Sequence, residues 1–443
     1  MMRICASLGS VEDIDSNDIA SADIIEIRTD VFGDVPSNIL KKGQTGLISF
    51  KGDVIASMIP EGWMADVGDA DRAAVSGSGA SVVISSHHNF DRTPCAETII
   101  DILGRTDGDI VKGAFAANSL SDAVALLDAS RRICRKHVII GMGELGKITR
   151  IRQERMGNEF TFAYVGKATA PGQLSVHEMR QMDDDLLITG IIGSGIGYTR
   201  SPAMHDAAFM HSGVRGKYLT FDTPSVDRAD EFILGFDIRG VNVTKPYKTD
   251  IINYLDACDK ISDATGAVNT VVNDNGKLKG YNTDVHGIEM ALKMNGIDVR
   301  GKRALILGSG GAARSCAYFL SENGCTAAVT GRNVAAAKKI ASDLSVTARE
   351  RTSVAVKGYD IIVNCIPLNT ENDASEYPIR IDQIDVRQTI FDMVYGRTHL
   401  NDIAERRGCS IVRGEDMLAH QGVRSFELFT SGRVPFSVMR NAV

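Results

Sequence analysis

One stretch of the second half, Arg303 to Arg314, limits the fold of this chain more than any other, and it reads R-A-L-I-L-G-S-G-G-A-A-R. Ala304 to Leu307 form a short apolar run of buried-strand length. Gly308, Gly310 and Ala313 then occupy the three small-residue positions of a strand–turn–helix unit that can bind a dinucleotide pyrophosphate at the helix N-terminus. Such a turn can also be purely structural. The stretch predicts a parallel sheet covered by helices.

The next apolar run decides which dinucleotide is expected. Ala327 to Thr330 is followed by Gly331-Arg332-Asn333, where an acidic residue would suit a ribose 2′-hydroxyl. An arginine suits a 2′-phosphate instead. The sequence therefore favours NADP as the cofactor.

Length, charge and cysteine spacing narrow the class of protein. A chain of 443 residues is expected to form two or three domains. The net charge of −7 without a Lys/Arg run argues against nucleic acid or a membrane surface as partner, and no apolar stretch approaches the roughly 20 residues of a membrane span. The N-terminus lacks the apolar region of a secretory signal, so we expect a cytoplasmic protein. The eight cysteines form no C-x-x-C pair, and we predict no metal site.

The first half, up to about Asp184, contains eight short strand-like runs, several of them separated by helical or Gly/Ser-rich stretches. This alternation predicts a closed parallel barrel whose functional residues lie at the C-terminal ends of the strands. The runs are Ile4–Ala6, Ile24–Ile27, Leu47–Phe50, Met64–Val67, Val82–Ile84, Asp109–Lys112, Val138–Gly141 and Phe160–Val165.

Polar residues follow several of these runs, and Lys112 is the unusual one. Its neighbours in G-D-I-V-K-G-A-F imply partial burial, which would lower the lysine pKa, and a neutral amine can attack a ketone. A lysine that reaches solvent from a strand end is the alternative. His88 in S-S-H-H-N-F could likewise be an ordinary core or surface histidine.

Five motifs of this half, in order, resemble type I 3-dehydroquinate dehydratase. They are E-I-R at 26–28, S-H-H-N-F at 86–90, D-I-V-K at 109–112, M-G-E-L-G-K-I-T-R at 142–150 and A-T-A-P-G-Q at 168–173. The resemblance implies that Lys112 forms an imine with the substrate ketone and that His88 moves the protons. Glu26 would orient these two side chains. The residues that it implies for substrate binding are Arg28, Lys51, Arg150, Thr169 and Gln173.

The barrel departs from that family in two ways. Lys51 stands where an arginine is usual, so a point charge replaces a planar fork. Only about a dozen residues separate Phe50 from Met64, which leaves no room for the usual third helix. Something should cover the strands there, and the candidates are the loop around Ile59 and Trp63, the second half of the chain, or a second subunit of a homodimer.

The second half begins after Gln181–Asp185, and it again alternates strands with helices. Thr199 and Ser201 precede a helix that starts near Pro202, so they could seat a carboxylate or simply cap the helix. Lys248 closes V-N-V-T-K-P-Y-K, and Asp284 closes G-Y-N-T-D after a hairpin turn. Both could be exposed charges, but if they face each other the acid can tune the lysine as a proton donor.

These motifs, with D-I-I-V-N-C-I-P at 360–367, F-D-M-V-Y at 391–395 and G-E-D-M-L-A-H-Q-G-V-R-S-F at 414–426, resemble shikimate dehydrogenase over about residues 187–440. The resemblance implies that Lys248 and Asp284 are the catalytic pair. The residues that it implies for shikimate binding are Thr199, Ser201, Thr244, Asn269, Tyr395 and Gln421. Those that it implies for NADP are Gly308, Ser309, Gly310, Gly311, Ala312, Thr330, Arg332 and Asn333.

The sequence thus predicts an α/β protein, with a shortened N-terminal (β/α)8 barrel fused to a two-lobed dehydrogenase that contains a Rossmann domain. The expected domains are 1–184 (dehydratase barrel), 185–287 (substrate lobe), 288–414 (NADP domain) and 415–443 (a helix returning to the substrate lobe). Two successive reactions are expected, dehydration of 3-dehydroquinate and NADPH-dependent reduction of 3-dehydroshikimate to shikimate. The alternatives are a quinate dehydrogenase, a regulatory protein on the same folds, or an inactive barrel beside a working reductase.

Overall fold

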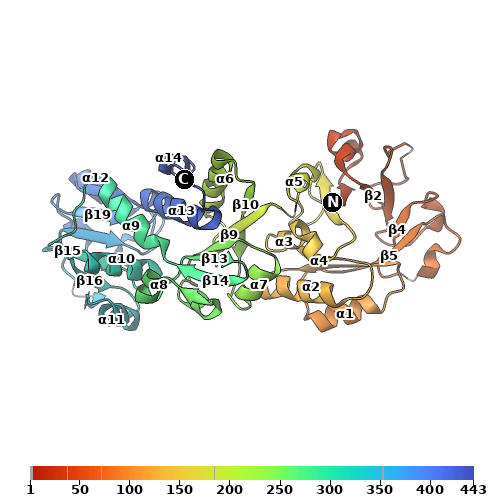
Figure 1. The fold of residues 1–443 in the computed structure, drawn as a ribbon. Helices are drawn as coiled ribbons and strands as arrows, with labels where there is room; N and C mark the ends of the chain where they lie inside the picture. Colours follow the sequence, from red (N-terminus) through yellow and green to blue (C-terminus); the bar gives the residue numbers. More distant parts are fainter. Residues whose placement is uncertain (1–2, 37, 71, 184, 352–353) are drawn as a thin grey trace. The chain divides into compact units, whose positions relative to one another are not determined.

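The computed structural model describes residues 3–36, 38–70, 72–183, 185–351 and 354–443. The chain divides into two compact units (Figure 1). Unit 1 comprises Met1–Leu186 and Phe221–Asp237, and unit 2 comprises Leu187–Thr220 and Ile238–Val443. No helix among the described residues is long and apolar enough to cross a membrane.

Unit 1 is built on eight parallel strands that lie side by side in sequence order, with β1 next to β8. All eight predicted runs are strands, namely β1 (Ile4–Leu8), β2 (Ile24–Arg28), β3 (Thr45–Ser49), β4 (Met64–Asp66), β5 (Val82–Asn89), β6 (Ile110–Ala116), β7 (His137–Met142) and β8 (Thr161–Val165). Closure of the barrel was predicted, but no ladder joins β7 to β8 in the described part of the chain. One backbone hydrogen bond from Glu159 to His137, 3.0 Å long, bridges the start of the seam. The barrel is therefore nearly closed.

The helices of unit 1 follow the strands unevenly. They are α1 (Ala96–Gly104), α2 (Leu120–Arg132), α3 (Lys147–Ile151), α4 (Gln153–Met156), α5 (Val176–Gln181) and α7 (Ala229–Gly235), with 3-10 turns at η1 (Val11–Asp15), η2 (Asn17–Ser21), η3 (Ala56–Met58) and η4 (Arg72–Val75). Helix α7 packs against α2 within this unit, and Arg228 Nη2 lies 2.6 Å from Asp128 Oδ2.

The predicted absence of a third helix is confirmed, because only η3 stands between β3 and β4. The loop itself covers the strands. Ile59 and Trp63 are 6% and 9% exposed, and a Cβ on Gly46 of β3 would come within 2.1 Å of the Trp63 ring. Only glycine at position 46 leaves room for this indole, which takes the place of a helix on the outer face.

The first sheet of unit 2 is mixed and has the order β10-β9-β11-β13-β14-β12. Its strands are β9 (Leu187–Gly193), β10 (Gly216–Asp222), β11 (Gly240–Val243), β12 (Ala257–Cys258), β13 (Thr270–Asp274) and β14 (Lys277–Tyr281), and its helices are α6 (Ser201–Ser212), η5 (Asp250–Tyr254) and α8 (Lys260–Thr265). The predicted Asn275-Gly276 hairpin is confirmed, with both residues at positive φ.

The second sheet of unit 2 is entirely parallel, in the order β17-β16-β15-β18-β19-β20. This 3-2-1-4-5-6 order is that of dinucleotide-binding folds. The strands are β15 (Arg303–Leu307), β16 (Thr326–Thr330), β17 (Thr347–Ala348), β18 (Ile361–Asn364), β19 (Thr389–Asp392) and β20 (Ser410–Arg413). The helices are α9 (Thr283–Met294), α10 (Gly311–Glu322), α11 (Val334–Asp343), η7 (Ala374–Glu376), η8 (Ile381–Gln383), α12 (His399–Arg407), α13 (Gly414–Thr430) and α14 (Phe436–Arg440).

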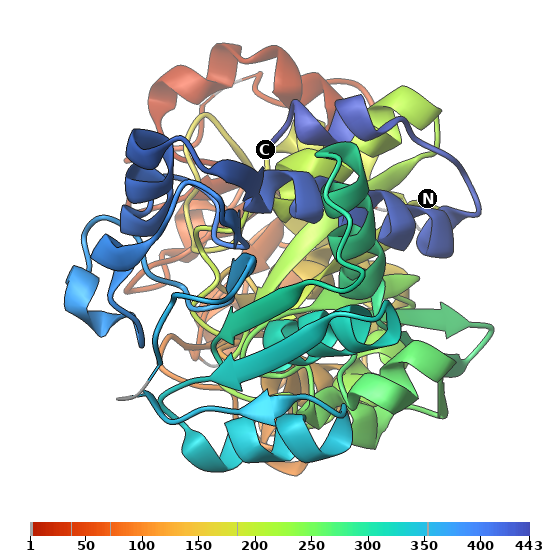
Figure 2. The ribbon, with the colours of Figure 1, turned by 90° about the vertical axis from the view of Figure 1, so that its left-hand side faces the viewer.

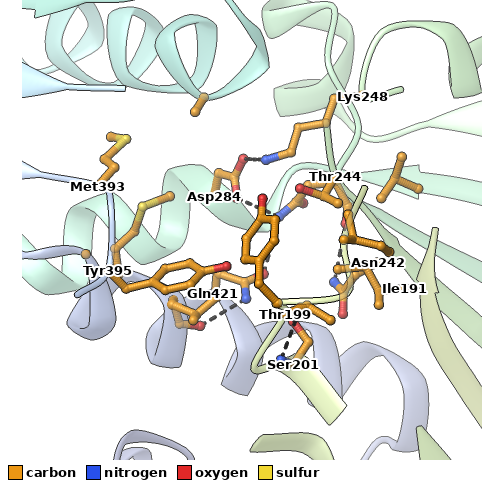
Figure 3. Close-up of a pocket in the computed structure, with 18 residues that line it drawn as sticks. Ile191, Thr199, Ser201, Asn242, Thr244, Lys248, Asp284, Met393, Tyr395 and Gln421 are labelled. Atoms are coloured by element: carbon orange, nitrogen blue, oxygen red, sulfur yellow. Dashed lines mark hydrogen bonds and ion pairs between the residues drawn. The ribbon is translucent and has the colours of Figure 1, made fainter. Parts of the chain in front are cut away.

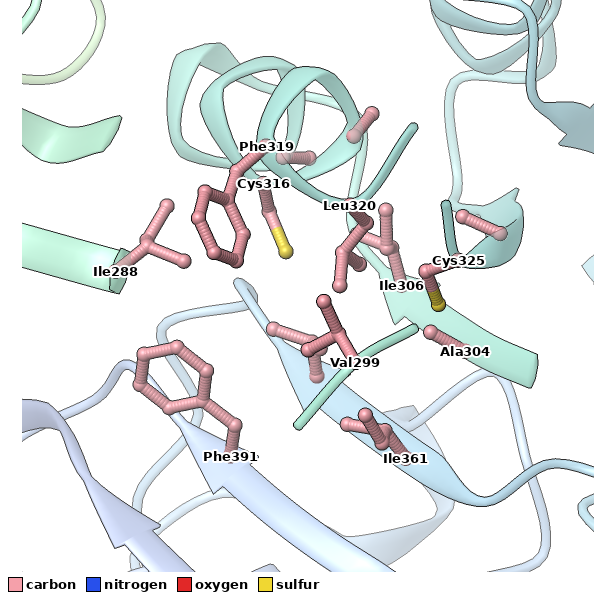
Figure 4. Packing of buried hydrophobic residues seen from close by; sticks show 14 of the residues in the cluster. Ile288, Val299, Ala304, Ile306, Cys316, Phe319, Leu320, Cys325, Ile361 and Phe391 are labelled. Carbon is pink, nitrogen blue, oxygen red and sulfur yellow. The ribbon is translucent and has the colours of Figure 1, made fainter. Parts of the chain in front are cut away.

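Helices cover both faces of this sheet (Figure 2). Ala304 and Ile306 of β15 pack under α9 and α10 (Figure 4), whereas the alternate residues Leu305 and Leu307 join the cluster on the other face. Strands buried on both faces read as continuous apolar runs, which is why β15 was visible in the sequence. The predicted α/β class, with a barrel and a Rossmann sheet, is confirmed apart from the open seam.

Candidate active sites

The pocket of unit 1 lies where the barrel strands end, and it gathers all eight residues predicted for this half. The predicted residues among its lining are Glu26, Arg28, Lys51, His88, Lys112, Arg150, Thr169 and Gln173. Ser7, Phe90, Met142 and Phe162 complete much of the wall. Segments far apart in the sequence thus place polar side chains in one cavity, as the barrel topology requires.

Lys112 lines this pocket and is paired with Asp66, a residue that the sequence analysis missed. Lys112 Nζ is 2.8 Å from Asp66 Oδ2, and the two side chains are 6% and 2% exposed. Ser86 Oγ donates to the other carboxylate oxygen at 2.7 Å. The ring of Phe162 lies 4.4 Å from Nζ. Asp66 ends β4, so its place at a strand end was the available signal.

The predicted lowering of the Lys112 pKa is wrong. Burial does act to lower it, but the charges of Asp66 and Glu26 outweigh burial, and the pKa of Lys112 is raised above its ordinary value. The same ion pair, with the Ser86 hydrogen bond, holds the pKa of Asp66 low although burial opposes this. Resting Lys112 is therefore an ammonium, which would have to lose its proton before the nitrogen could act as a nucleophile.

Glu26 is held rigidly beside this pair. It is 4% exposed, Ser49 Oγ donates to Oε1 at 2.6 Å, and Ser7 Oγ donates to Oε2. A carboxylate bound from two strands by hydroxyl donors can orient neighbouring groups without moving itself. Neither serine was predicted.

His88 is a neutral imidazole in this environment. Burial, followed by the charges of Lys112 and Lys51, lowers its pKa to about 4. A neutral ring can accept a proton near pH 7, which is the property that a general base needs.

Arg150 is a buried cation of the pocket that no protein carboxylate neutralises within the described residues. It is 2% exposed, Nη1 donates to the Phe162 carbonyl at 3.3 Å, and Nε has no protein partner. Burial lowers its pKa to about 10. Arg28, by contrast, is held by Asp30 through two bonds of 3.1 and 2.6 Å. A buried guanidinium without a counter-charge suits a ligand carboxylate.

Thr169 and Gln173 shape the loop above the barrel. Gln173 Oε1 accepts from the backbone and hydroxyl of Thr169, at 2.7 and 2.9 Å, and from the backbone of Ala170 at 3.0 Å. The amide NH2 of Gln173 thus remains available as a donor, while Lys51 is exposed on the pocket wall.

The pocket of unit 2 lies between the two sheets and gathers all eight residues predicted for catalysis and substrate binding (Figure 3). They are Thr199, Ser201, Thr244, Lys248, Asn269, Asp284, Tyr395 and Gln421. Asn242, Tyr198 and Met393 also line it and were not assigned to the site from sequence. Asn242 lies on β11, two residues before Thr244, which directly follows the strand, so strand alternation could have identified it.

Lys248 and Asp284 do face each other. Lys248 Nζ lies 2.5 Å from Asp284 Oδ2, and Asn269 Nδ2 donates to Oδ1 at 2.8 Å (Figure 3). Asn282 caps α9, so Asp284 lies in its first turn, where the helix dipole favours a carboxylate. An acid fixed at both oxygens can hold the lysine in one position.

Hydroxyls and one aromatic ring define the rest of this pocket. Thr199 Oγ1 donates to Ser201 Oγ at 3.2 Å, beside the N-terminus of α6. Tyr395 has a pKa raised to about 12, chiefly by burial, so its phenol remains a donor near pH 7. Together these donors suit a polyhydroxylated acid.

The predicted nucleotide residues meet at the turn between β15 and α10. Gly308 has φ +118° and its backbone N–H donates to Thr330 at 2.7 Å, which brings the end of β16 to the turn. A Cβ on Gly310 would meet no atom within 4 Å, so open space lies over the turn. Gly311 lies against Lys248, and Ala312 lines the catalytic pocket.

The residues after β16 fit a 2′-phosphate. Asn333 caps α11 by accepting from Ala336 at 3.0 Å. Arg332 is exposed and has no ion-pair partner in the part of the chain that the structure describes. The turn, the helix N-terminus and this arginine therefore fit NADP. No group of three His, Cys, Asp or Glu side chains that could hold a metal was found among the described residues.

Comparison with known proteins assigns the two units. A family model described as type I 3-dehydroquinase matches residues 65–184. Models of the shikimate dehydrogenase substrate-binding domain and of the shikimate 5′-dehydrogenase C-terminal domain match residues 191–271 and 414–443.

Individual relatives agree with the second assignment. The shikimate dehydrogenase (NADP(+)) of Moorella thermoacetica is 37% identical over 269 residues, which are 57% of this chain and 90% of the relative. The solved shikimate 5-dehydrogenase of Thermus thermophilus, in complex with NADP(H) and shikimate, is 31% identical with a TM-score of 0.54, and the match covers 58% of this chain and 98% of that one. A quinate dehydrogenase from Corynebacterium glutamicum in complex with NAD is 26% identical with a TM-score of 0.55, covering 58% and 99%.

The order of these domains along one polypeptide joins a lyase domain to an NADP-dependent oxidoreductase domain, as the motifs predicted. The chain belongs to the shikimate dehydrogenase family and carries a type I 3-dehydroquinase domain ahead of it, which makes it a bifunctional protein of the shikimate pathway.

Proposed function

We propose that unit 1 dehydrates 3-dehydroquinate through an imine on Lys112, and that unit 2 reduces the product, 3-dehydroshikimate, to shikimate with NADPH. The observation that carries the proposal is that each unit has a lysine, paired with an aspartate, that lines a pocket together with the other residues that its chemistry needs. The product of the first reaction is the substrate of the second.

In unit 1 the first step is loss of the Lys112 proton, for which Asp66 at 2.8 Å is the nearest acceptor. The free amine adds to the ketone carbon, and water leaves as the imine forms. His88, neutral at pH 7, removes a proton from the adjacent carbon and returns it to the departing hydroxyl. A second water hydrolyses the imine and releases the product and the lysine.

Arg150 would bind the substrate carboxylate, because it is the buried cation without a protein counter-charge among the described residues. Lys51 and Arg28, nearer the pocket mouth, would contact substrate hydroxyls together with Thr169 and Gln173. Glu26, held by its two serines, would keep His88 and Lys112 oriented.

In unit 2 the residues of the β15–α10 turn with Thr330, Arg332 and Asn333 would hold NADP, which supplies the hydride when bound. Lys248 would give its proton to the substrate carbonyl oxygen, and Asp284 would hold the ammonium at that position. Thr199 and Ser201 would bind the carboxylate, while Thr244, Asn269, Tyr395 and Gln421 would contact the ring hydroxyls.

The proposal includes the predicted domain boundaries at 184, 287 and 414, and it includes a homodimer. We also propose that the protein acts in the cytoplasm on small molecules and does not bind nucleic acid. Sedimentation of the full chain tests the dimer. Limited proteolysis tests the boundaries.

A coupled assay tests the function. The full chain is supplied with 3-dehydroquinate and NADPH, and consumption of NADPH is expected only if both units work. Supplying 3-dehydroshikimate directly isolates the second reaction, and quinate with NAD tests the alternative substrate. Turnover of 3-dehydroshikimate but not of 3-dehydroquinate would show that only the reductase works. Failure with both would overturn the proposal.

A further inference from the structure

Tyr218 is a buried phenol behind the reductase pocket, and it belongs to neither the catalytic pair nor the predicted substrate residues. It lies on β10, is 1% exposed, and its OH donates to Asn242 Oδ1 at 2.7 Å. Strand β9 lies between β10 and β11, so the phenol reaches across a whole strand to this partner. Burial raises the pKa of Tyr218 well above its ordinary value, although the Ser201 hydroxyl opposes the rise. The phenol therefore stays protonated.

His205 of α6 holds the tyrosine ring in place. The two rings stack with centroids 4.2 Å apart and planes 8° from parallel, and Phe429 lies 6.0 Å from the imidazole. His205 is fully buried, and burial lowers its pKa to about 3, so it is neutral. Because neither ring nitrogen has a protein partner among the described residues, His205 contributes a flat apolar surface.

A continuous set of hydrogen bonds leads from Tyr218 to the catalytic carboxylate. Asn242 Nδ2 donates to Thr270 Oγ1 at 3.0 Å, and Thr270 Oγ1 donates to Asn269 Oδ1 at 3.2 Å. Asn269 Nδ2 then donates to Asp284 Oδ1 at 2.8 Å. Every member of this relay is buried, and each donates to the next in the same direction.

The direction of the first two hydrogen bonds depends on their first donor, whereas the Asn269 amide is also fixed by the Thr283 backbone N–H, which donates to its Oδ1 at 2.7 Å. An asparagine side chain can present either its oxygen or its NH2 group to a neighbour, and the neighbours decide which. The Tyr218 hydroxyl selects the oxygen of Asn242, so the NH2 group faces Thr270 and the hydroxyl of Thr270 is directed to Asn269. Phenylalanine at position 218 would keep the ring and remove this choice.

We infer that Tyr218 is a positioning residue of the reductase, which fixes the Asp284 carboxylate against Lys248 through Asn242, Thr270 and Asn269 although it touches neither member of the pair. This inference rests on the proposed dehydrogenase function, and it adds a residue that the catalytic motifs do not contain. A residue that acts in this way should affect turnover more than substrate binding, because Asp284 orients the proton donor.

The test is steady-state oxidation of shikimate by NADP in the full chain. Tyr218→Phe and Thr270→Val should each lower kcat about tenfold, with KM for shikimate changed less than about twofold, because each leaves a buried polar group without its partner. Thr270→Ser should restore most of kcat. Tyr281→Phe, a tyrosine on β14 outside the relay, is the control for losing a phenol. A raised KM with normal kcat in Tyr218→Phe would overturn the inference.

A double-mutant cycle separates positioning from a general structural effect. In an Asp284→Asn background, Tyr218→Phe should cause no further loss, because the group that it positions is gone. Additive losses would contradict the relay. If Tyr218→Phe lowers the melting temperature so far that it cannot be assayed, the Thr270→Val and Thr270→Ser pair decides in its place. A wild-type chain that oxidises no shikimate would refute the proposed function, whereas a working enzyme with an unaffected Tyr218→Phe variant would refute only this inference.

Discussion

The two lysine–aspartate pairs use the same charges in differently enclosed sites. The side chains of Lys112 and Asp66 are 6% and 2% exposed, and an aromatic ring covers the ammonium. The side chains of Lys248 and Asp284 are 17% and 5% exposed, and the lysine stem lies against Gly311 at the start of the nucleotide helix. Lys112 is thus buried in the barrel, whereas Lys248 is partly exposed beside the glycine turn.

The difference fits what each amine is proposed to do. A nucleophile that becomes bonded to its substrate works best where water is excluded. A proton donor must be reprotonated after every turnover and needs a path to solvent. In this proposal Asp66 would neutralise the buried Lys112 ammonium until substrate binds, whereas Asp284 would orient the more accessible Lys248 ammonium.

Replacing either lysine gives the largest expected effect and tests whether the two pairs are independent. Lys112→Met should abolish dehydration and spare reduction, and Lys248→Met should do the opposite, because each amine belongs to a different fold. Separate assays with 3-dehydroquinate and 3-dehydroshikimate measure this. Borohydride with 3-dehydroquinate should leave an adduct on Lys112 by peptide mass spectrometry. Loss of both activities in one folded variant would show that the comparison is wrong.

Removing Asp66 tests the comparison by measuring how much free energy of unfolding is lost when the buried Lys112 ammonium has no aspartate beside it. Asp66→Asn should lower the free energy of unfolding by about 3–5 kcal/mol near pH 7, because Lys112 is left charged without a partner. Because the native pKa of Asp66 is lowered, Asp66 stabilises the fold at pH values above its ordinary pKa of 3.8. That stabilisation is lost as the pH falls through the native pKa. The gap between variant and wild type should therefore narrow in acid.

Urea unfolding followed at several pH values measures this gap, and Asp101→Asn on the exposed face of α1 is the control, expected within about 0.5 kcal/mol of wild type. The rise of dehydratase rate with pH should also move to lower pH in Asp66→Asn. The reason is that the raised pKa of Lys112 depends on Asp66. A gap that is constant with pH would contradict the ion pair as its source.

Replacing Arg332 tests the proposed contact between unit 2 and the 2′-phosphate of NADP. Arg332→Ala should weaken NADP binding about ten- to a hundredfold, the value of a charge-assisted contact of roughly 1.5–3 kcal/mol. NAD binding should barely change. Titration with each nucleotide measures both, and Lys338→Ala, an exposed lysine on α11 just after Arg332, is the matched control. Equal losses for NADP and NAD would refute the 2′-phosphate contact.

The smallest expected effect concerns which segments cover the outer face of the barrel strands in unit 1. The fragment Met1–Asp184 should melt below the same residues in the full chain, because it lacks α7 and with it the bond between Arg228 and Asp128. Each kcal/mol lost should lower the melting temperature by about 2–4 °C. Differential scanning calorimetry and sedimentation compare the two. A monomeric, active fragment that melts at the full-length temperature would show that the Ile59–Trp63 loop is sufficient cover.

The site residues could be predicted because parallel strands carry their functional side chains at one edge, so motifs far apart in sequence converge. For this reason one pocket contains Lys112, His88 and Arg150. The other pocket contains Lys248 and Asp284. Asp66 was missed because β4 is only three residues long and gives a weak pattern. The relay was missed because its first member, Tyr218, lies outside the motifs and because its members come together only when β10, β11, the start of β13 and α9 pack in the folded unit.

Local sequence determined what depends on near neighbours: the strand runs, the Asn275-Gly276 turn, the glycine turn after β15 and the shortage of residues for a third helix. Tertiary structure alone decided what depends on distant charges. The pKa of Lys112 is the clearest case, because burial read from its neighbours predicts a lower value and Asp66, 46 residues away, raises it. Electrostatic energy is set by distance and dielectric in the folded protein, and the sequence specifies neither until the strands are brought together.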